Sequence, residues 1–413
     1  MPQSEIITGL DIGSNNIRIA VGELSGDFDQ LNIIGLAEVR SAGVSKGNIR
    51  SIEEVVKSII SAKTKAEKMT SVPLDRAAVS VSGSHIMSQS SKGVVSVLRS
   101  DGEIMESDVN RVLENAHAVS IPANYEILHV LPKTFSIENQ TGIKDPIGMN
   151  GVRLEVEAQI IEGQSTHIKN IEKAVNLAGF AIDDLVLGCL AESECALTER
   201  QKDLGVVLLN MGSTTTSVLV FEEEDVFLVK ILPVGSGHIT NDIAIGLRTN
   251  IDIAESIKIQ YGSTIPGLIE GADEIQMSSI DEKEDGSFSK KYLTEIISAR
   301  VEEIFSLVDK ELRSINRSGK LPSGVVLTGG GAKLAGIVET AKRVFRLPAS
   351  IGFPISVSSA IDRLNSPDYT TAVGLVQWAV ANHLSKEGPN IFGETLRLIF
   401  RKAKSLMSFL NRR

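Results

Sequence analysis

Two short turns, about 200 residues apart, carry small polar side chains of the kind that bind phosphate. Residues 6–21 read IITGLDIGSNNIRIAV and residues 205–220 read GVVLLNMGSTTTSVLV, so each turn joins two apolar runs. This pattern predicts two β-hairpins. Glycine lets the backbone approach an anion, and hydroxyl and N–H groups donate hydrogen bonds to it. The candidate contacts are Asp11, Gly13, Ser14, Asn15 and Asn16 in the first copy and Gly212, Ser213, Thr214 and Thr215 in the second.

The repetition makes these turns informative. A single Gly-Ser turn is usually only a hairpin, whereas two copies that each open a half of the chain indicate two related lobes closing on one nucleotide. A triple glycine, Gly329-Gly330-Gly331, follows a β-branched strand and precedes a helix expected to begin near Lys333. A flat ligand can lie against such a backbone at a helix N-terminus. The alternative is a tight strand–helix turn without a ligand.

One carboxylate and one ammonium group complete the candidate site. Glu255 and Lys258 lie one helical turn apart and point to the same side of a predicted helix. The carboxylate can accept hydrogen bonds from ribose hydroxyls, and the ammonium can contact the sugar or the adenine edge. The alternative is a surface ion pair, which contributes little to stability.

The elements that must position these residues alternate between strands and helices. Strands are expected at 32–39, 77–83 and 183–190, and helices at 51–69, 166–180 and 253–262. Residues 84–162 instead hold short strands, one helix near 106–118 and a turn-rich segment, which predicts a small inserted α+β domain. In the second half we expect strand, turn and helix over 226–247, an exposed hairpin or loop at 271–289, a helix over about 291–315 and a last helix at 369–384.

Composition excludes several functional classes. The formal charge of −10 and an aromatic content of 4% argue against nucleic acid as a partner. Cys189 and Cys195 have no metal-ligand spacing around them and are expected to be buried free thiols, and the six histidines show no metal-binding pattern either. No apolar run reaches the roughly 18–20 residues that span a bilayer, and no N-terminal signal peptide is visible.

The C-terminal segment differs from the rest of the chain in charge. Residues 391–413 hold one acid, Glu394, and six bases. At about 100° per residue the apolar side chains fall on one side of a helix and the basic ones mainly on the other, as in helices that lie in a membrane interface. The alternative is a helix docked on the body. The membrane-binding residues are expected to be Leu396, Arg397, Ile399, Phe400, Arg401, Lys402, Lys404, Met407 and Leu410.

The ordered set of motifs is the layout of the actin, heat-shock chaperone and sugar-kinase ATPase fold. Longer strings are SGSHI at 82–86, EILHVLPKTFSI at 126–137, DPIGMNGVRLE at 145–155, HITNDIAIGLRT at 238–249 and VVLTGGGAKLAGI at 325–337. With these strings the chain resembles the FtsA family of bacterial cell-division proteins over essentially its whole length. The resemblance implies an α/β, actin-like two-lobed fold with duplicated cores, an inserted small α+β subdomain and a C-terminal amphipathic helix.

The resemblance also implies a function and partners. It implies an ATP-binding protein, with Mg near Asp11, that assembles with itself and tethers FtsZ filaments to the inner face of the cytoplasmic membrane at the division site. The expected partners are the FtsZ C-terminal tail, further copies of this chain, an anionic membrane surface and other division proteins. The alternatives are a pilus-assembly ATPase and a small-molecule kinase or chaperone ATPase of the same fold.

The sequence departs from the family pattern at the second turn. The family usually has an Asp and a run of glycines there, whereas this chain has Asn210-Met211-Gly212, and an amide is a weaker partner for a divalent cation. Gly235-Ser236-Gly237 replaces a usual Gly-Gly-Asp, with Gly235 and Gly237 still expected at the nucleotide. The first turn lacks a lysine, although Arg18 follows it. Glu192 and Glu194 are near the expected position of water-positioning groups. We therefore expect nucleotide binding with, at most, slow ATPase activity.

Six segments are expected from the resemblance. They are a first core subdomain of 1–83 with 163–200 and 366–384; an insertion at 84–162; a second core subdomain of 201–236 with 321–365; its small subdomain at 237–320; a linker at 385–392; and a membrane-binding helix at 393–413.

Overall fold

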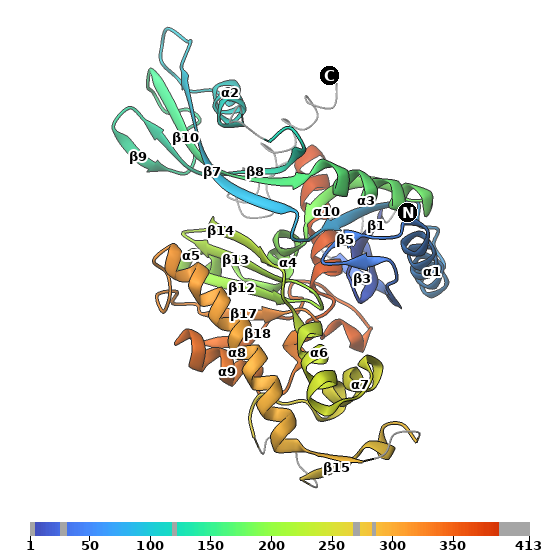
Figure 1. Cartoon of the computed structure of the whole chain (residues 1–413). Coiled ribbons are helices and arrows are strands. Elements are labelled where there is room, and N and C mark those ends of the chain that lie inside the picture. The colour runs from blue at the N-terminus through green and yellow to red at the C-terminus, as the bar shows by residue number, and fades with distance from the viewer. Residues whose placement is uncertain (1–4, 25–30, 118–121, 267–272, 283–285, 388–413) are drawn as a thin grey trace.

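The computed structural model describes residues 5–24, 31–117, 122–266, 273–282 and 286–387 (Figure 1). Figure 1 shows two sheet-containing lobes side by side, the first on the right and the second on the left and below, with a smaller sheet and its own helix projecting above them. The amphipathic helix predicted at 393–413, and the membrane-binding residues assigned to it, lie outside the described residues. Among the described residues, no helix is both long and apolar enough to cross a membrane.

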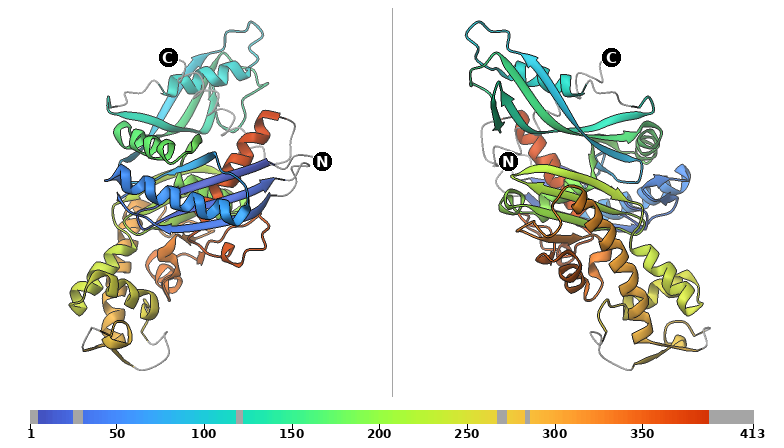
Figure 2. Two further views of the ribbon diagram at one scale, coloured as in Figure 1. Left: turned by 90° about the vertical axis from the view of Figure 1, so that its right-hand side faces the viewer. Right: turned by 60° about the vertical axis from the view of Figure 1, so that its left-hand side comes forward.

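The first lobe is built on a five-stranded sheet. Its order is β11-β6-β1-β2-β3, where β1 (Glu5–Ile12), β2 (Asn16–Leu24) and β3 (Leu31–Arg40) form an antiparallel meander and β6 (Arg76–Val81) and β11 (Ala181–Leu187) run parallel to β1. Helices α1 (Ile52–Thr70) and α3 (Ser165–Leu177) cover one face. Helices α4 (Gly188–Ala196) and α10 (Thr370–Glu387) cover the other. Figure 2 shows these layers from two further sides.

The second lobe repeats this sheet. Its order is β14-β13-β12-β17-β18, where β12 (Val206–Met211), β13 (Thr216–Glu222) and β14 (Asp225–Leu232) form the meander and β17 (Val325–Thr328) and β18 (Ala349–Ile351) run parallel to β12. Strand order and strand directions therefore match the first lobe. Alternate residues of β12 point to opposite faces, so that Val206 and Leu208 join the core around α4 and α10, while Val207 and Leu209 join the core under α8.

The insertion forms a separate small core. Its antiparallel sheet has the order β7-β10-β8-β9, made of β7 (Ile86–Ser96), β8 (Tyr125–Ile137), β9 (Gln140–Ile143) and β10 (Arg153–Gln164), with α2 (Glu106–His117) packed on it. The insertion also touches the second lobe, because the Lys144 Nζ lies 2.7 Å from an Asp225 carboxylate oxygen at the start of β14.

The remaining elements belong mainly to the second lobe. They are α5 (Glu199–Leu204), α6 (Ser236–Leu247), α7 (Ile251–Tyr261), the short hairpin of β15 (Glu274–Gln276) and β16 (Ser287–Ser289), α8 (Lys290–Ser314) and α9 (Ile337–Phe345). The long helix predicted at about 291–315 is α8. A short hairpin precedes α1; its two strands, β4 (Val44–Ser45) and β5 (Asn48–Ile49), have two residues each.

Several predicted boundaries were wrong, and three of the differences have a clear physical reason. The strand expected over 183–190 ends at Leu187, opposite Val81, which is the last residue of its partner β6, so no ladder partner remains. The helix expected near Lys333 is instead a short 3-10 turn, η2 (Gly330–Lys333). The helix α9 begins only at Ile337, because Gly336 before it has a left-handed backbone with a φ of 77°, which a continuous right-handed helix does not allow. Helix α10 continues to Glu387, into the predicted linker, because the first helix-breaking residues in this part of the sequence are Gly388 and Pro389.

Candidate functional site

A cavity of about 640 Å³ lies between the two lobes. It is lined by both predicted turns, by α6 and α7, by η2 and by the loop that precedes α10. Of the predicted nucleotide contacts, all but Gly235 and Gly237 line it. Those two glycines instead pack against the second turn: a Cβ on Gly235 would lie 2.5 Å from the Gly212 carbonyl oxygen, and one on Gly237 would lie 2.9 Å from that of Ser213. Ser236, between them, lines the cavity.

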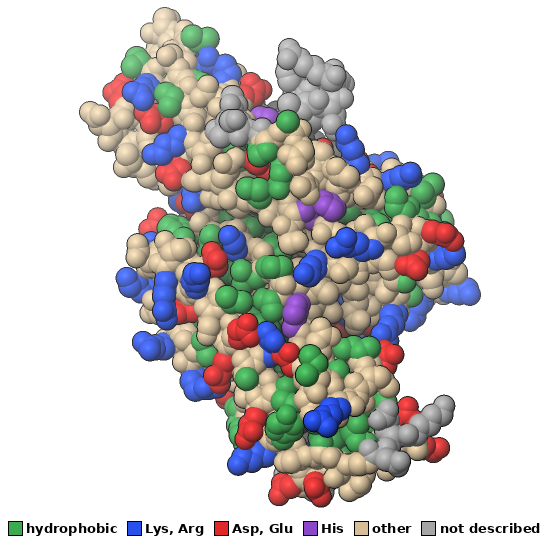
Figure 3. All heavy atoms as spheres, in the orientation of Figure 1, with side chains coloured by type: hydrophobic (Ala, Val, Ile, Leu, Met, Phe, Trp, Pro, Cys, Tyr) green, Lys and Arg blue, Asp and Glu red, His purple; other side chains and the backbone are tan. Residues whose placement is uncertain are grey.

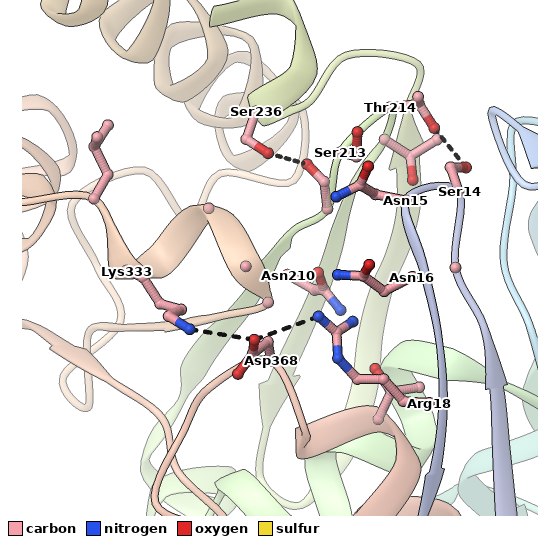
Figure 4. Close-up of a pocket in the computed structure, with 18 of the residues that line it drawn as sticks. Ser14, Asn15, Asn16, Arg18, Asn210, Ser213, Thr214, Ser236, Lys333 and Asp368 are labelled. Carbon is pink, nitrogen blue, oxygen red and sulfur yellow. Dashed lines mark hydrogen bonds and ion pairs between the residues drawn. The ribbon is translucent and has the colours of Figure 1, made fainter. Parts of the chain in front are cut away.

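The two turns have the same internal hydrogen bond and touch each other. The Gly13 N–H donates to the Asn16 carbonyl oxygen at 3.1 Å, and the Gly212 N–H donates to the Thr215 carbonyl oxygen at 3.0 Å. Across the cavity, the Thr214 hydroxyl donates to the Ser14 hydroxyl oxygen at 2.8 Å (Figure 4). The sequence repeat thus brings two equivalent turns, one from each lobe, to one place.

The tip of the β4–β5 hairpin contacts both turns. The Lys46 N–H donates to the Thr214 hydroxyl oxygen at 3.1 Å, and the Gly47 N–H donates to the Ser14 hydroxyl oxygen at 3.4 Å. The carbonyl oxygen of Lys46 accepts a hydrogen bond from the N–H of Ser84, at the root of the insertion. A Cβ on Gly47 would lie 1.9 Å from the Ser82 carbonyl oxygen, so glycine is needed for this close approach.

The three glycines after β17 differ in what surrounds them. A Cβ on Gly329, whose φ is 79°, would lie 2.3 Å from the Asn210 side-chain oxygen, and one on Gly331 would lie 2.7 Å from the Met211 side chain. Both therefore allow η2 to pack tightly on β12. A Cβ on Gly330 meets no heavy atom within 4 Å, and Gly330 lines the cavity. Packing requires the outer two glycines, and the middle one leaves open space in the cavity.

Glu255 and Lys258 form an ion pair of 2.6 Å on the cavity wall. The exposed fractions of their side chains are 33% and 12%, so this is not the exposed surface pair that was the alternative. Both groups also contact Thr240 of α6, whose hydroxyl lies 2.5 Å from the Glu255 carboxylate and 2.7 Å from the Lys258 Nζ. The pair therefore joins α6 to α7 where both helices border the cavity.

One carboxylate bridges cations from the two lobes. Asp368, in the loop before α10, lies 3.3 Å from the guanidinium of Arg18 on β2 and 3.4 Å from the Nζ of Lys333 in η2 (Figure 4). Arg18 also pairs with Glu38 at 3.3 Å. Asp368 and Lys333 were not predicted as site residues from the sequence. Lys333 lies within the LTGGGAKL string, which could have indicated it, but no spacing connects Asp368 with Arg18.

A buried carboxyl lies behind the second turn. Glu192 of α4 is fully buried and accepts hydrogen bonds from the Asn210 side-chain amide, from the Thr371 hydroxyl at 2.5 Å and from the Thr328 hydroxyl at 3.1 Å. Burial raises its pKa to about 7. Burial also raises the pKa of Asp11, although Arg18 and the Ser80 hydroxyl oppose the shift. The Glu194 carboxylate does not line the cavity and instead pairs with the Lys202 Nζ at 3.0 Å.

Glu192→Gln is expected to raise the melting temperature at pH 8, with the gain shrinking as the pH falls to 5. The folded-state pKa of about 7 exceeds the unfolded value of 4.5, so ionising Glu192 opposes folding, and this cost develops between those pH values and is complete above them. At about 1.4 kcal/mol per pKa unit the cost is about 3 kcal/mol. Glu194→Gln is the control and should lower the melting temperature, because it removes the carboxylate that pairs with the buried ammonium group of Lys202. A gain that is independent of pH would contradict this assignment.

Comparison with known proteins identifies the family. A family model described as "Cell division protein FtsA" matches residues 207–374, and one described as "SHS2 domain inserted in FTSA" matches residues 83–162. The cell division protein FtsA of Pseudomonas aeruginosa is 37% identical over 91% of this chain and 89% of its own length. The chain belongs to the FtsA family. The FtsA proteins of Bacillus subtilis and Escherichia coli are 38% and 32% identical over 92% and 93% of this chain and 85% and 92% of their own.

Solved structures confirm the actin-like fold of this FtsA-family chain. A PilM–PilN type IV pilus biogenesis complex has a TM-score of 0.66 at 16% identity, covering 91% of this chain and 98% of that one. MreB5 of Spiroplasma citri bound to AMPPNP has a TM-score of 0.55 at 12% identity, covering 93% and 100%. The predicted duplication of the α/β core is confirmed with it, and the general role in bacterial cell division follows from membership of the FtsA family.

Proposed function

We propose that this FtsA-family chain binds ATP with Mg²⁺ between its lobes, assembles with further copies of itself, and tethers FtsZ filaments to the cytoplasmic face of the membrane at the division site. The observation that carries the nucleotide part is the pair of equivalent turns joined through Ser14 and Thr214. Two polar turns from duplicated lobes meet in one cavity, as a ligand with several phosphate groups requires.

The lining of the cavity suits a nucleotide with a metal ion. The hydroxyl-bearing residues Ser14, Ser213 and Thr214 line the part of the cavity where phosphates would lie. Gly330 leaves room for the nucleoside beside Glu255 and Lys258. Among the described residues, the lining cations are Arg18, Lys258 and Lys333, and each already pairs with a carboxylate. The phosphate charge would therefore be met largely by Mg²⁺, for which Asp11 is the nearest candidate acid on the first turn.

Turnover is expected to be slow, and Asn210→Asp alone should not restore it. In that variant two carboxylates would meet where the Asn210 amide now donates to Glu192, so one of them would stay protonated. Asn210→Asp combined with Glu192→Gln reverses this amide–carboxylate pair, so the new acid accepts from the Gln amide, stays ionised and can hold a metal-bound water shell; this variant should release phosphate fastest. The measurement is phosphate release with ATP-Mg for the wild type, both single variants and the double variant. A wild-type rate in the usual kinase range of about 1–100 per second would refute the prediction.

The membrane and FtsZ parts of the proposal rest on family membership and on the tail sequence. The basic amphipathic pattern over 393–413 would anchor the chain peripherally, and a tether is the role that needs such an anchor in a cell-division protein. FtsZ would bind through its C-terminal tail, and the insertion would serve contacts with other division proteins.

The proposal is tested with purified full-length protein in two assays. Millimolar ATP-Mg should raise its melting temperature, because a ligand that binds only the folded state stabilises it. Vesicles containing anionic lipid should pellet it and, through it, FtsZ. A melting temperature that does not respond to ATP-Mg would refute nucleotide binding, and FtsZ that stays in the supernatant while this chain pellets would refute the tether.

A further inference from the structure

The outer surface of the first lobe is formed by α1 and α3, which both face the viewer in the left view of Figure 2. The two helices pack against each other and are joined at one end, where the Lys63 Nζ donates to the Gly179 carbonyl oxygen at 2.7 Å and lies 4.6 Å from the centre of the Phe180 ring. Their solvent-facing sides therefore form one continuous surface.

This surface carries lysines with aliphatic side chains between them. On α1 the exposed residues beyond the first turn include Lys57, Ile60, Lys68 and Met69, and on α3 they include Lys169, Lys173 and Leu177. At about 100° per residue, Lys57, Ile60 and Lys68 share one side of α1, and Lys169, Lys173 and Leu177 share one side of α3. Met69 lies about 180° around α1 from Ile60 and is not part of this side. We call the other six residues the lysine face. The exposed fractions of Ile60 and Leu177 are 44% and 59%.

Acidic residues are largely absent from the exposed sides of these two helices. Within the described α1 and α3, the exposed acids are Glu53 and Glu54, in the first turn of α1, where the helix dipole favours them. Glu67 and Glu172 are half-buried. The chain as a whole has a formal charge of −10, and charges of both signs are intermixed over the second lobe (Figure 3). A basic face on an acidic protein is complementary to an anionic partner surface.

The mixture of side chains indicates which anionic surface fits. Lysines can extend their ammonium groups to phosphate headgroups while their aliphatic stems lie along apolar material. Exposed Ile and Leu side chains among such lysines can enter the boundary between headgroups and acyl chains. The surface is formed by two helices, and neither α1 nor α3 carries a Phe, Tyr or Trp for stacking on nucleic-acid bases. The imidazole of His167 in α3 is half-buried and packs against the ring of His85.

We propose that the lysine face is a second membrane contact, which lies on anionic headgroups and holds the first lobe flat against the bilayer. The proposal rests on the membrane attachment put forward above, in which the tail is the anchor. A single terminal anchor leaves the body free to rotate, whereas a second basic contact fixes which side faces the lipid. With α1 and α3 on the membrane, the opposite side of the first lobe and the second lobe face the cytoplasm.

The test compares two charge-reversal variants of the full chain. The first is Lys68→Glu, Lys169→Glu and Lys173→Glu. The matched control reverses three exposed lysines of the second lobe, Lys291, Lys310 and Lys320, and changes the net charge equally. Both are titrated with vesicles of phosphatidylcholine and phosphatidylglycerol. Since a base near an anionic surface contributes about 1 kcal/mol, the first variant should bind at least about tenfold more weakly than the wild type, and the control should bind within about twofold of it.

The outcomes separate this proposal from the one it rests on. A wild type that does not bind vesicles refutes membrane attachment itself. A wild type that binds, together with a lysine-face variant that binds equally well, refutes the lysine face as a membrane contact and leaves the tail as the anchor; the face would then serve a protein partner. Equal weakening in both triple variants also refutes it, since net charge alone would explain the loss.

A second measurement reports orientation without altering the lysines. A dye is attached at Ser61→Cys, on the exposed side of α1, or at Ser314→Cys, at the end of α8; the native Cys189 and Cys195 are buried. Lipids that carry a quencher in the headgroup region should quench the dye at residue 61 of vesicle-bound protein severalfold more than the dye at residue 314. Equal quenching at the two positions would overturn the proposal even if the charge-reversal variants failed to fold.

Discussion

Gly330→Val is expected to abolish stabilisation by ATP-Mg while leaving the melting temperature of the unliganded protein unchanged. A Cβ at this position meets no heavy atom within 4 Å, and the residue has no left-handed φ, so the folded chain accommodates a side chain there. The same open space is part of the cavity between the lobes. Branched methyl groups would fill the volume that the proposed nucleoside needs. The measurement is the thermal shift with and without millimolar ATP-Mg.

The neighbouring glycines are the controls for this prediction. Gly329→Val and Gly331→Val should lower the melting temperature without any ligand, since their side chains would overlap Asn210 and Met211. Such overpacking typically costs about 1–3 kcal/mol, and the positive φ of Gly329 adds strain. If Gly330→Val kept the full response to ATP-Mg, the nucleoside would have to lie elsewhere, and the assignment of the triple glycine would be wrong.

A chain ending at Glu387 is expected to stay in the supernatant with anionic vesicles and to keep its response to ATP-Mg. The cut falls at the end of α10 and removes all six bases of residues 391–413. It also removes the apolar stripe, whose burial contributes about 25 cal/mol per Å². Binding that remains should be weak and should disappear at high salt, which screens charges over about 8 Å at physiological strength. Co-sedimentation and thermal shift on the same preparations check both halves of the prediction.

Two single substitutions separate the apolar stripe from net charge. Phe400→Glu places a carboxylate within the stripe, whereas Phe409→Glu makes the same chemical change nine residues later, about 180° around the helix. Phe400→Glu should release the full-length protein from vesicles, and Phe409→Glu should weaken binding only as far as its charge does. Equal release by both variants, or a shortened chain that pellets like the intact one, would show that the tail does not bind as an interfacial helix.

The turns of the site could be predicted because their information is local. A Gly-Ser turn between two apolar runs with strand-forming residues favours a hairpin through its own residues, and the Gly13 and Gly212 hydrogen bonds follow from that. The position of Asp368 could not be predicted, since it depends on how a loop some 350 residues from Arg18 packs into the cavity. Gly235 and Gly237 were predicted at the nucleotide, but they do not line the cavity and instead pack against the second turn. A glycine pattern alone does not distinguish room for a ligand from room for a neighbouring backbone.

The hydrogen bond between Glu192 and Asn210 is a second contact that could not be predicted from the sequence. The sequence indicated that Asn210 replaces an acid, but it placed Glu192 only roughly. The structure shows that these two residues hydrogen bond, so the second turn has an acid close behind it rather than within it. Two residues 18 positions apart meet here because α4 is enclosed between the sheets of the two lobes, which is a property of the tertiary packing.

The β4–β5 hairpin gives the insertion a thermodynamic connection to the cavity. Its tip hydrogen bonds to both turns on one side and to the backbone at Ser84 on the other, so the position of the turns and the position of the insertion's root are not independent variables. Any molecule that binds the insertion and favours one arrangement of its root also favours one arrangement of the turns. Coupling of this kind is reciprocal: the factor by which such a partner changes the affinity for nucleotide is the factor by which nucleotide changes the affinity for the partner.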